Sequence, residues 1–146
     1  MIRPVEPRDR AVYLQLAAEF YHSPAVLHPV PTVYLETTFE EITHASPYAE
    51  GFLLEQDGEA VGYALLSKGF SQEAGGAVVW VEELYIRETC RGQGLGSAFF
   101  RYLDEYLPPA VKRVRLEVEP DNARAAALYA RHGFRPLPYA QMVKDR

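Results

Sequence analysis

The chain has 146 residues, of which 48% are hydrophobic and 24% are charged. This length and balance predict one domain, residues 1–146, with a buried core. No apolar run reaches the roughly 18 residues of a membrane span, and the N-terminus lacks the apolar core of a signal peptide, so we expect a cytoplasmic protein without a membrane partner. The single cysteine excludes an internal disulfide, and the histidines lack metal-ligand spacing, so we expect no metal.

The net charge of −5 disfavours a nucleic-acid partner, and the charge is uneven along the chain. Residues 1–67 carry three basic and ten acidic side chains, whereas residues 68–146 carry twelve basic and ten acidic ones. No lysine or arginine occurs from Ala11 to Ser67. We therefore do not expect this segment to face a polyanion. The same pattern is also typical of an acidic surface that aids solubility.

Turn residues divide the first half of the chain into a strand, two helices and a hairpin. The segment from Ile2 to Val5 is typical of a short edge strand, and Asp9 stands where a helix N-cap is preferred, before an apolar helical stripe that ends near Tyr21. A loop with three prolines precedes a second helix. Asp57-Gly58 joins two apolar runs, which predicts a β-hairpin.

The second half alternates between strands and helices. A long β-branched and aromatic strand leads into the glycine-rich segment Arg91–Gly96, and a helix follows from about Ser97 to the Pro108-Pro109 pair. The long strand spans residues 78–86, and the remaining predicted elements are strands at residues 111–118 and 134–143 and a helix at residues 122–132. The pattern predicts a mixed α/β fold around an antiparallel hairpin.

The glycine turn between strand and helix is a candidate anion site. Its backbone N–H groups lie at the positive end of a helix dipole, which favours phosphate or pyrophosphate. The turn lacks the Gly-Lys-Ser/Thr of a mononucleotide P-loop and the Gly-x-Gly-x-x-Gly spacing of a dinucleotide site. A tight connection without a ligand is the alternative interpretation.

Two motifs resemble those of the GNAT superfamily of acyl-CoA N-acyltransferases. Arg91-Gly92-Gln93-Gly94-Leu95-Gly96 matches the Arg/Gln-x-x-Gly-x-Gly/Ala signature. Downstream, Asn122, Leu128-Tyr129 and Gly133-Phe134 are similar to the second motif of that superfamily. The resemblance implies an α/β (α+β) GNAT fold: a bent, mainly antiparallel sheet of about six or seven strands flanked by about four helices. Two central parallel strands would splay apart in a V that admits acetyl-CoA.

The resemblance also implies which residues contact the cofactor. Backbone groups of the strand would bind the pantetheine arm, and N–H groups of the turn would bind the pyrophosphate. Asn122 would contact the cofactor arm, and nearby arginines could serve its phosphates. The cofactor-binding residues are then Leu84, Tyr85, Ile86, Arg91, Gly92, Gln93, Gly94, Leu95, Gly96, Ser97, Asn122, Arg124 and Tyr129.

Direct acetylation of an amine needs a proton donor for the departing thiolate and a proton acceptor for the amine. The resemblance places Tyr129 near the CoA sulfur as the acid; a packed helix aromatic is the alternative. Glu82 and Glu83 lie in an apolar strand, where only one of two adjacent side chains reaches a given face unless a bulge intervenes. This strand is similar to that of the spermidine/spermine acetyltransferase branch, which favours Glu82 over Glu83 as the base. A salt bridge or an exposed pair is the alternative.

The same resemblance suggests a small cationic, polyamine-like amine as acceptor. Tyr21, His22, His28 and Tyr34 lie in the region that lines the acceptor side in this superfamily, and they join Glu82 and Glu83 as candidate substrate contacts. We expect an N-acetyltransferase that uses acetyl-CoA, with homodimerisation as the candidate assembly. Acetylation of a protein lysine or N-terminus and a non-catalytic CoA-binding module are the alternatives.

Overall fold

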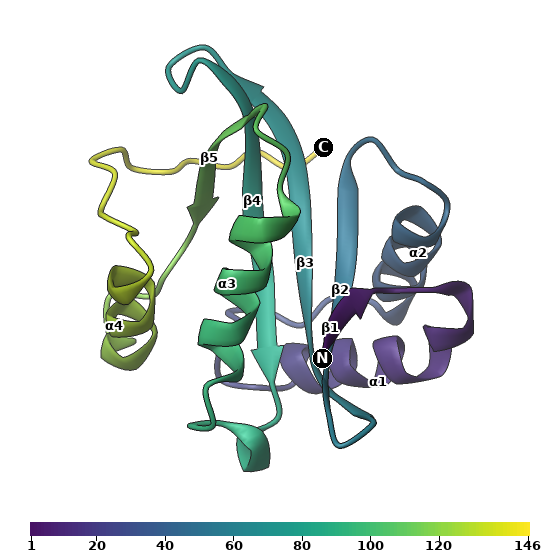
Figure 1. The fold of residues 1–146 in the computed structure, drawn as a ribbon. Coiled ribbons are helices and arrows are strands. Elements are labelled where there is room, and N and C mark those ends of the chain that lie inside the picture. Colours follow the sequence, from purple (N-terminus) through teal and green to yellow (C-terminus); the bar gives the residue numbers. More distant parts are fainter.

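A computed structural model describes residues 1–146 (Figure 1). The chain forms five strands and four helices, with short 3₁₀ turns between some of them. The elements are β1 (Ile2–Pro4), α1 (Arg10–Tyr21), α2 (Thr32–Thr43), β2 (Ala49–Gln56), β3 (Glu59–Ser71), β4 (Gly76–Ile86), α3 (Leu95–Tyr106), β5 (Val111–Leu116) and α4 (Ala123–Arg131). Short 3₁₀ turns lie at Pro7–Asp9 and Glu88–Cys90.

Local chemistry explains several boundaries. Asp57 and Gly58 both have positive φ, at 52° and 82°, as the tight turn between β2 and β3 requires. Asn122 caps α4 by accepting a hydrogen bond from the Ala125 N–H at 3.1 Å. Asp9 precedes α1 as predicted, but its side chain does not cap that helix. The carboxylate instead accepts two hydrogen bonds from the Arg3 guanidinium, at 2.7 and 2.9 Å.

The five strands form one sheet in the order β1-β2-β3-β4-β5. The first three pairings are antiparallel, and β4 with β5 is the parallel pair. The predicted fold class and the predicted parallel pair are therefore confirmed, with fewer strands than expected.

Helices cover both faces of this sheet. Phe99, Phe100 and Leu103 of α3 pack on one face against side chains of β2, β3 and β4. Residues of α1 and α2 pack on the other face, around Leu53 and Tyr63. Figure 1 shows α3 in front of β4 and running roughly along it, with α1 and α2 together on the other side of the view. No helix is both long enough and apolar enough to cross a bilayer.

The predicted terminal strand at residues 134–143 is wrong. No strand follows α4, and these residues lie in an irregular segment that ends the chain. Pro136 and Pro138 explain the difference, because each lacks the N–H that a strand donates to its neighbour. Smaller differences occur elsewhere: α3 begins at Leu95 rather than near Ser97, and β5 ends at Leu116 rather than Val118.

Candidate active site

A β-bulge in β4 decides where the two strand carboxylates lie. Leu65 of β3 pairs with Glu83, but Leu66 pairs with Val81, so Glu82 is the extra residue on β4. An extra residue reverses the alternation of side chains along a strand. Val81 accordingly packs beneath α3, whereas Glu83 points to the face that α1 covers.

Glu82 reaches that same face. It is exposed, and its carboxylate accepts a hydrogen bond from the Ser67 hydroxyl at 2.5 Å. Leu66 is buried under α3, so strand alternation puts its neighbour Ser67 on the face of α1. The bulge therefore gathers both carboxylates on one side of the sheet.

Glu83 lies in a much less solvated setting than Glu82. One carboxylate oxygen accepts a hydrogen bond from the Tyr21 hydroxyl, and the other accepts one from Tyr63. Burial raises the pKa of Glu83; the two tyrosine hydrogen bonds oppose that rise, and the charge of Glu82 adds to it. Burial is also the first cause of the raised pKa values of Tyr21 and Tyr63.

The parallel strands separate just beyond these carboxylates. The pairing of β4 with β5 ends at Val81 and Leu116. The rest of β4, from Glu82 to Ile86, continues without a β5 neighbour. This is the V-shaped gap that the resemblance implied, and it opens at the bulge.

Backbone groups of β4 face the gap. The Arg87 N–H donates to the Val61 carbonyl at 2.9 Å, which fixes the alternation of the antiparallel ladder between β3 and β4. The backbone of Tyr85 therefore faces β3, whereas that of Leu84 and Ile86 faces the open edge. Of the three residues predicted to contact the cofactor from this strand, Leu84 and Ile86 have backbone groups at the unpaired edge, whereas Tyr85 does not. The Ile86 carbonyl also accepts a hydrogen bond from Arg91 Nε at 2.8 Å.

The glycine turn directly follows this open edge. Gly92 and Gly94 have φ of 76° and 82°, values that favour glycine. None of the six backbone N–H groups from Gly92 to Ser97 donates to an acceptor in the chain. They lie at or just before the start of α3, where the helix dipole is positive. The turn therefore has the unsatisfied donors that a pyrophosphate site needs.

Other predicted cofactor contacts lie around the turn. An Arg124 guanidinium nitrogen lies close to Gly92, only 3.2 Å from where a Cβ would be. Gln93 accepts a side-chain hydrogen bond from Gln56. Gly96 allows Leu128 of α4 to pack closely, because a Cβ there would lie 2.9 Å from a Leu128 methyl group. Helices α3 and α4 thus meet beside the turn.

Tyr129 lies on α4 among aromatic rings. Its ring centroid is 5.7 Å from that of Phe100 and 5.9 Å from that of Phe134. Burial raises the pKa of Tyr129, and its hydroxyl makes no hydrogen bond within the chain. The hydroxyl is therefore free to donate its proton to a ligand.

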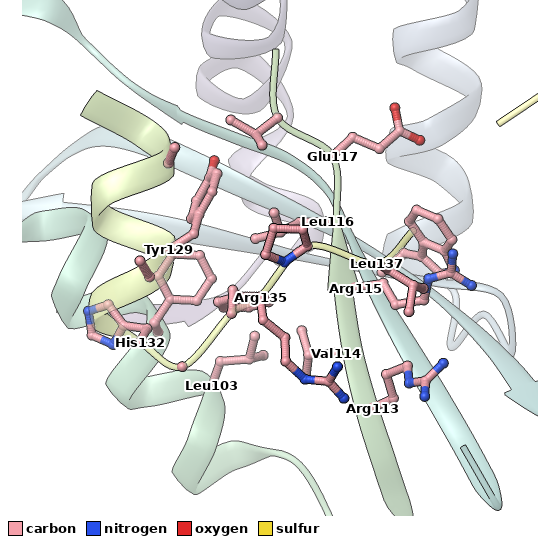
Figure 2. Close-up of a pocket in the computed structure, with 18 of the residues that line it drawn as sticks. Leu103, Arg113, Val114, Arg115, Leu116, Glu117, Tyr129, His132, Arg135 and Leu137 are labelled. Carbon is pink, nitrogen blue, oxygen red and sulfur yellow. The ribbon is translucent and has the colours of Figure 1, made fainter. Parts of the chain in front are cut away.

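A cavity of about 800 Å³ borders Tyr129. Figure 2 shows Tyr129 on the α4 side of this cavity and Leu116 of β5 across from it, with Arg135 and Leu137 from the C-terminal segment. Tyr129 is the only predicted site residue that lines the cavity. The carboxylates and the glycine turn lie outside it.

Several of the predicted substrate-contact residues do not lie against the strand carboxylates. His22, which directly follows α1, makes a hydrogen bond through Nδ1 to the Ala18 carbonyl of that helix, and Tyr34 is 58% exposed. His28 is also exposed, so only Tyr21 of the predicted acceptor-side residues contacts a strand carboxylate. No group of three or more His, Cys, Asp or Glu side chains is arranged to hold a metal ion.

Sequence reasoning missed Tyr63 and Ser67. Both lie on β3 and contact the carboxylates across the sheet. The alternating pattern of β3 places them on one face, but only the register against β4 shows which carboxylate each one meets. Strand pairing was therefore the missing information.

Comparisons with known proteins all point to acetyltransferases. The model of the acetyltransferase (GNAT) family matches residues 12–134. Spermine/spermidine N(1)-acetyltransferase of Bacillus subtilis is 31% identical over 85 residues, which are 56% of each chain. Mycothiol acetyltransferase of Beutenbergia cavernae is 37% identical over 87 residues, 59% of this chain and 28% of that protein. The matched regions thus span about half or less of these relatives.

Solved structures show the same fold. An integron cassette protein from the mobile metagenome of Cole Harbour Salt Marsh superposes with a TM-score of 0.84 at 24% identity, covering 99% of this chain and 89% of that one. The aminoglycoside acetyltransferase AAC(6')-Iy, solved with a bisubstrate analogue containing CoA, gives a TM-score of 0.77 at 18% identity, covering 100% and 97%. At these identities the likeness concerns the fold.

Proposed function

Because this chain belongs to the acetyltransferase (GNAT) family, we propose that it transfers an acetyl group from acetyl-CoA to the primary amine of a small cationic molecule. The observation that carries the proposal is the row of six unpaired N–H groups at the start of α3, directly after the strand edge that β5 leaves open. A diphosphate and an extended amide chain have complementary hydrogen-bonding groups.

The residues present fit acetyl-CoA. The N–H groups of residues 92–97 would bind its pyrophosphate, and Arg124 lies close enough to the turn to add a positive charge. Backbone groups of Leu84 and Ile86 would bind the pantetheine amides as a neighbouring strand does. Arg87, in contrast, is committed to Glu19, whose carboxylate accepts two of its hydrogen bonds at 3.0 Å.

Direct transfer assigns two proton steps. A carboxylate on the bulge takes a proton from the ammonium group, which leaves an electron pair on the nitrogen. That pair forms a bond to the thioester carbonyl carbon, the carbon–sulfur bond breaks, and Tyr129 protonates the departing thiolate. The second proton that the nitrogen loses restores Tyr129. A positioned acid or base contributes about 10²- to 10⁴-fold to such a rate.

Charge supports a cationic acceptor. Glu82 and Glu83 lie on one face of the sheet beside the gap, and no lysine or arginine occurs in residues 11–67, which include α1 after its first residue and all of α2. Negative charge on this side attracts ammonium groups. The similarity to a spermine/spermidine acetyltransferase agrees with this choice.

Thiol release from acetyl-CoA tests the proposal. The panel contains a polyamine, an aminoglycoside, a lysine peptide and an anionic amine such as aspartate, each at low and high ionic strength. We expect the polyamine to give the highest kcat/KM, and higher salt to weaken it by screening. Preference for the anionic amine would overturn the acceptor assignment. Acetyl-CoA binding without thiol release from any amine would indicate a non-catalytic module.

A further inference from the structure

Tyrosine hydroxyls from two different elements hold the carboxylate of Glu83 at both oxygens. Tyr21 is the last residue of α1, and Tyr63 lies within β3. Tyr63 has no exposed surface, and its ring packs against Tyr13 and Phe20 at centroid distances of 5.4 and 6.2 Å. Because packing fixes the ring of Tyr63, it also fixes where its hydroxyl holds the carboxylate.

The two hydrogen bonds leave Glu83 able to accept more. An ionised carboxylate has about four lone-pair positions, and the tyrosines occupy one on each oxygen. Glu83 is partly exposed rather than fully buried. Glu82, on the same face, is open to solvent and bonded to Ser67. An ammonium group at this face therefore meets two different carboxylates: Glu83, which is held by two tyrosine hydroxyls, and Glu82, which is exposed to solvent.

We propose that Tyr21 and Tyr63 are positioning residues that orient Glu83, and that Glu83 rather than Glu82 takes the proton from the ammonium group of the acceptor. This inference rests on the proposed acetyl transfer at this site. In the step, an N–H bond breaks, its electron pair stays on nitrogen, and the proton forms an O–H bond to Glu83. Both tyrosines keep their own protons, and Glu82 supplies negative charge that holds the cation.

The pH dependence follows from the groups that face Glu83. These are Tyr13 and Tyr21 from α1, Tyr63 from β3 and Glu82 from β4. Burial raises the pKa of Glu83, whereas the hydrogen bonds from Tyr21 and Tyr63 lower it. Loss of either hydroxyl therefore favours protonated Glu83, which cannot accept a proton. The resulting loss of activity is greatest at neutral pH and below.

The test compares Tyr21→Phe and Tyr63→Phe with Tyr13→Phe. Tyr13 is a matched control because it is a buried tyrosine of the same cluster whose hydroxyl does not bond Glu83. The measurement is kcat/KM for acetylation of a polyamine against pH. We expect both test variants to lose roughly ten-fold at pH 7, the effect of one hydrogen bond to a charged group, and to recover at alkaline pH. Tyr13→Phe keeps the parent profile.

A second measurement does not depend on turnover. The side-chain carboxyl of Glu83 is titrated by ¹³C NMR in the free protein, with its signal assigned by its absence in Glu83→Gln. The titration midpoint moves to higher pH in Tyr21→Phe and Tyr63→Phe but not in Tyr13→Phe.

The outcomes separate the two proposals. If the parent is active and the acidic limb of its kcat/KM profile against pH is unchanged in all three variants, the positioning role is overturned. An unchanged NMR titration midpoint of Glu83 in Tyr21→Phe and Tyr63→Phe overturns it as well. Variants that merely lose thermal stability, with an unchanged pH profile, also overturn it. If none of the amines makes the parent release thiol, the proposed function fails, and the NMR titration still decides whether the tyrosines control the protonation of Glu83.

Discussion

Replacing Gly94 with glutamate puts a carboxylate among the unpaired N–H groups of the glycine turn. A Cβ at Gly94 has nothing within 4 Å, so the new side chain meets no steric obstacle. Its φ of 82° costs a non-glycine residue about 1–2 kcal/mol. Two unit negative charges about 4 Å apart repel by about 4 kcal/mol at an effective dielectric constant of about 20. We therefore expect the affinity for acetyl-CoA to fall by about three orders of magnitude.

Gly75→Glu is the matched control for this change. Gly75 has a φ of 78° and equally open surroundings, but it lies in the turn between β3 and β4, at the other end of β4. Both variants carry the same added charge and similar backbone strain. Calorimetric titration with acetyl-CoA should show near-parent affinity for Gly75→Glu, and the deficit of Gly94→Glu should shrink at high salt. Equal affinities in two folded variants would refute the pyrophosphate assignment.

Three further predictions concern other parts of the chain. Tyr129→Phe removes a hydroxyl without a partner, so melting temperature and acetyl-CoA affinity should hold while kcat falls about 10²- to 10⁴-fold at every pH. Asp9→Asn should cost about 2 kcal/mol of unfolding free energy at pH 7, because the partly buried Arg3 loses one of its two carboxylate partners and keeps only Glu55. The pKa of Asp9 is lowered chiefly by its hydrogen bonds with that arginine, so this stability is lost as pH falls, and urea unfolding at acid pH should show a smaller difference. Gly62→Ala makes a Cβ overlap the Tyr85 carbonyl oxygen, so it should destabilise the fold by about 1–3 kcal/mol and weaken acetyl-CoA binding, whereas Gly69→Ala on the same strand meets open space and should do neither.

Local chemistry made part of this molecule predictable. Asp57-Gly58 and Asn122 act within a few residues of themselves, so the hairpin turn and the cap of α4 could be predicted from the sequence. The order of strand, glycine turn and helix was predictable for the same reason. The terminal strand failed because its apolar residues outweighed two prolines that remove ladder donors.

The placement of the carboxylates could not be predicted in this way. Whether Glu82 and Glu83 share a face depends on a bulge, and a bulge is a property of two paired strands. The sequence of β4 alone does not determine whether the bulge forms. Tyr21 and Tyr63 come from elements 62 and 20 residues away from Glu83, and only the fold brings them to it.

Burial of Glu83 has a consequence for stability that separates it from Glu82. The pKa of Glu83 is raised in the folded chain, chiefly by burial, so the folded state binds this proton more tightly than the unfolded state does. Stability from this group is therefore greatest at acid pH and falls as pH rises from the ordinary glutamate pKa through the raised one. Glu83→Gln removes the ionised group, so we expect it to be more stable than the parent at pH 7 to 8, where the parent carboxyl is ionised, and not at pH 4. Glu82→Gln, at the exposed position, should stay within about 0.5 kcal/mol of the parent at both pH values. Urea unfolding at the two pH values measures this, and a Glu83→Gln variant less stable than the parent at pH 7 would show that the ionised carboxylate stabilises the tyrosine cluster.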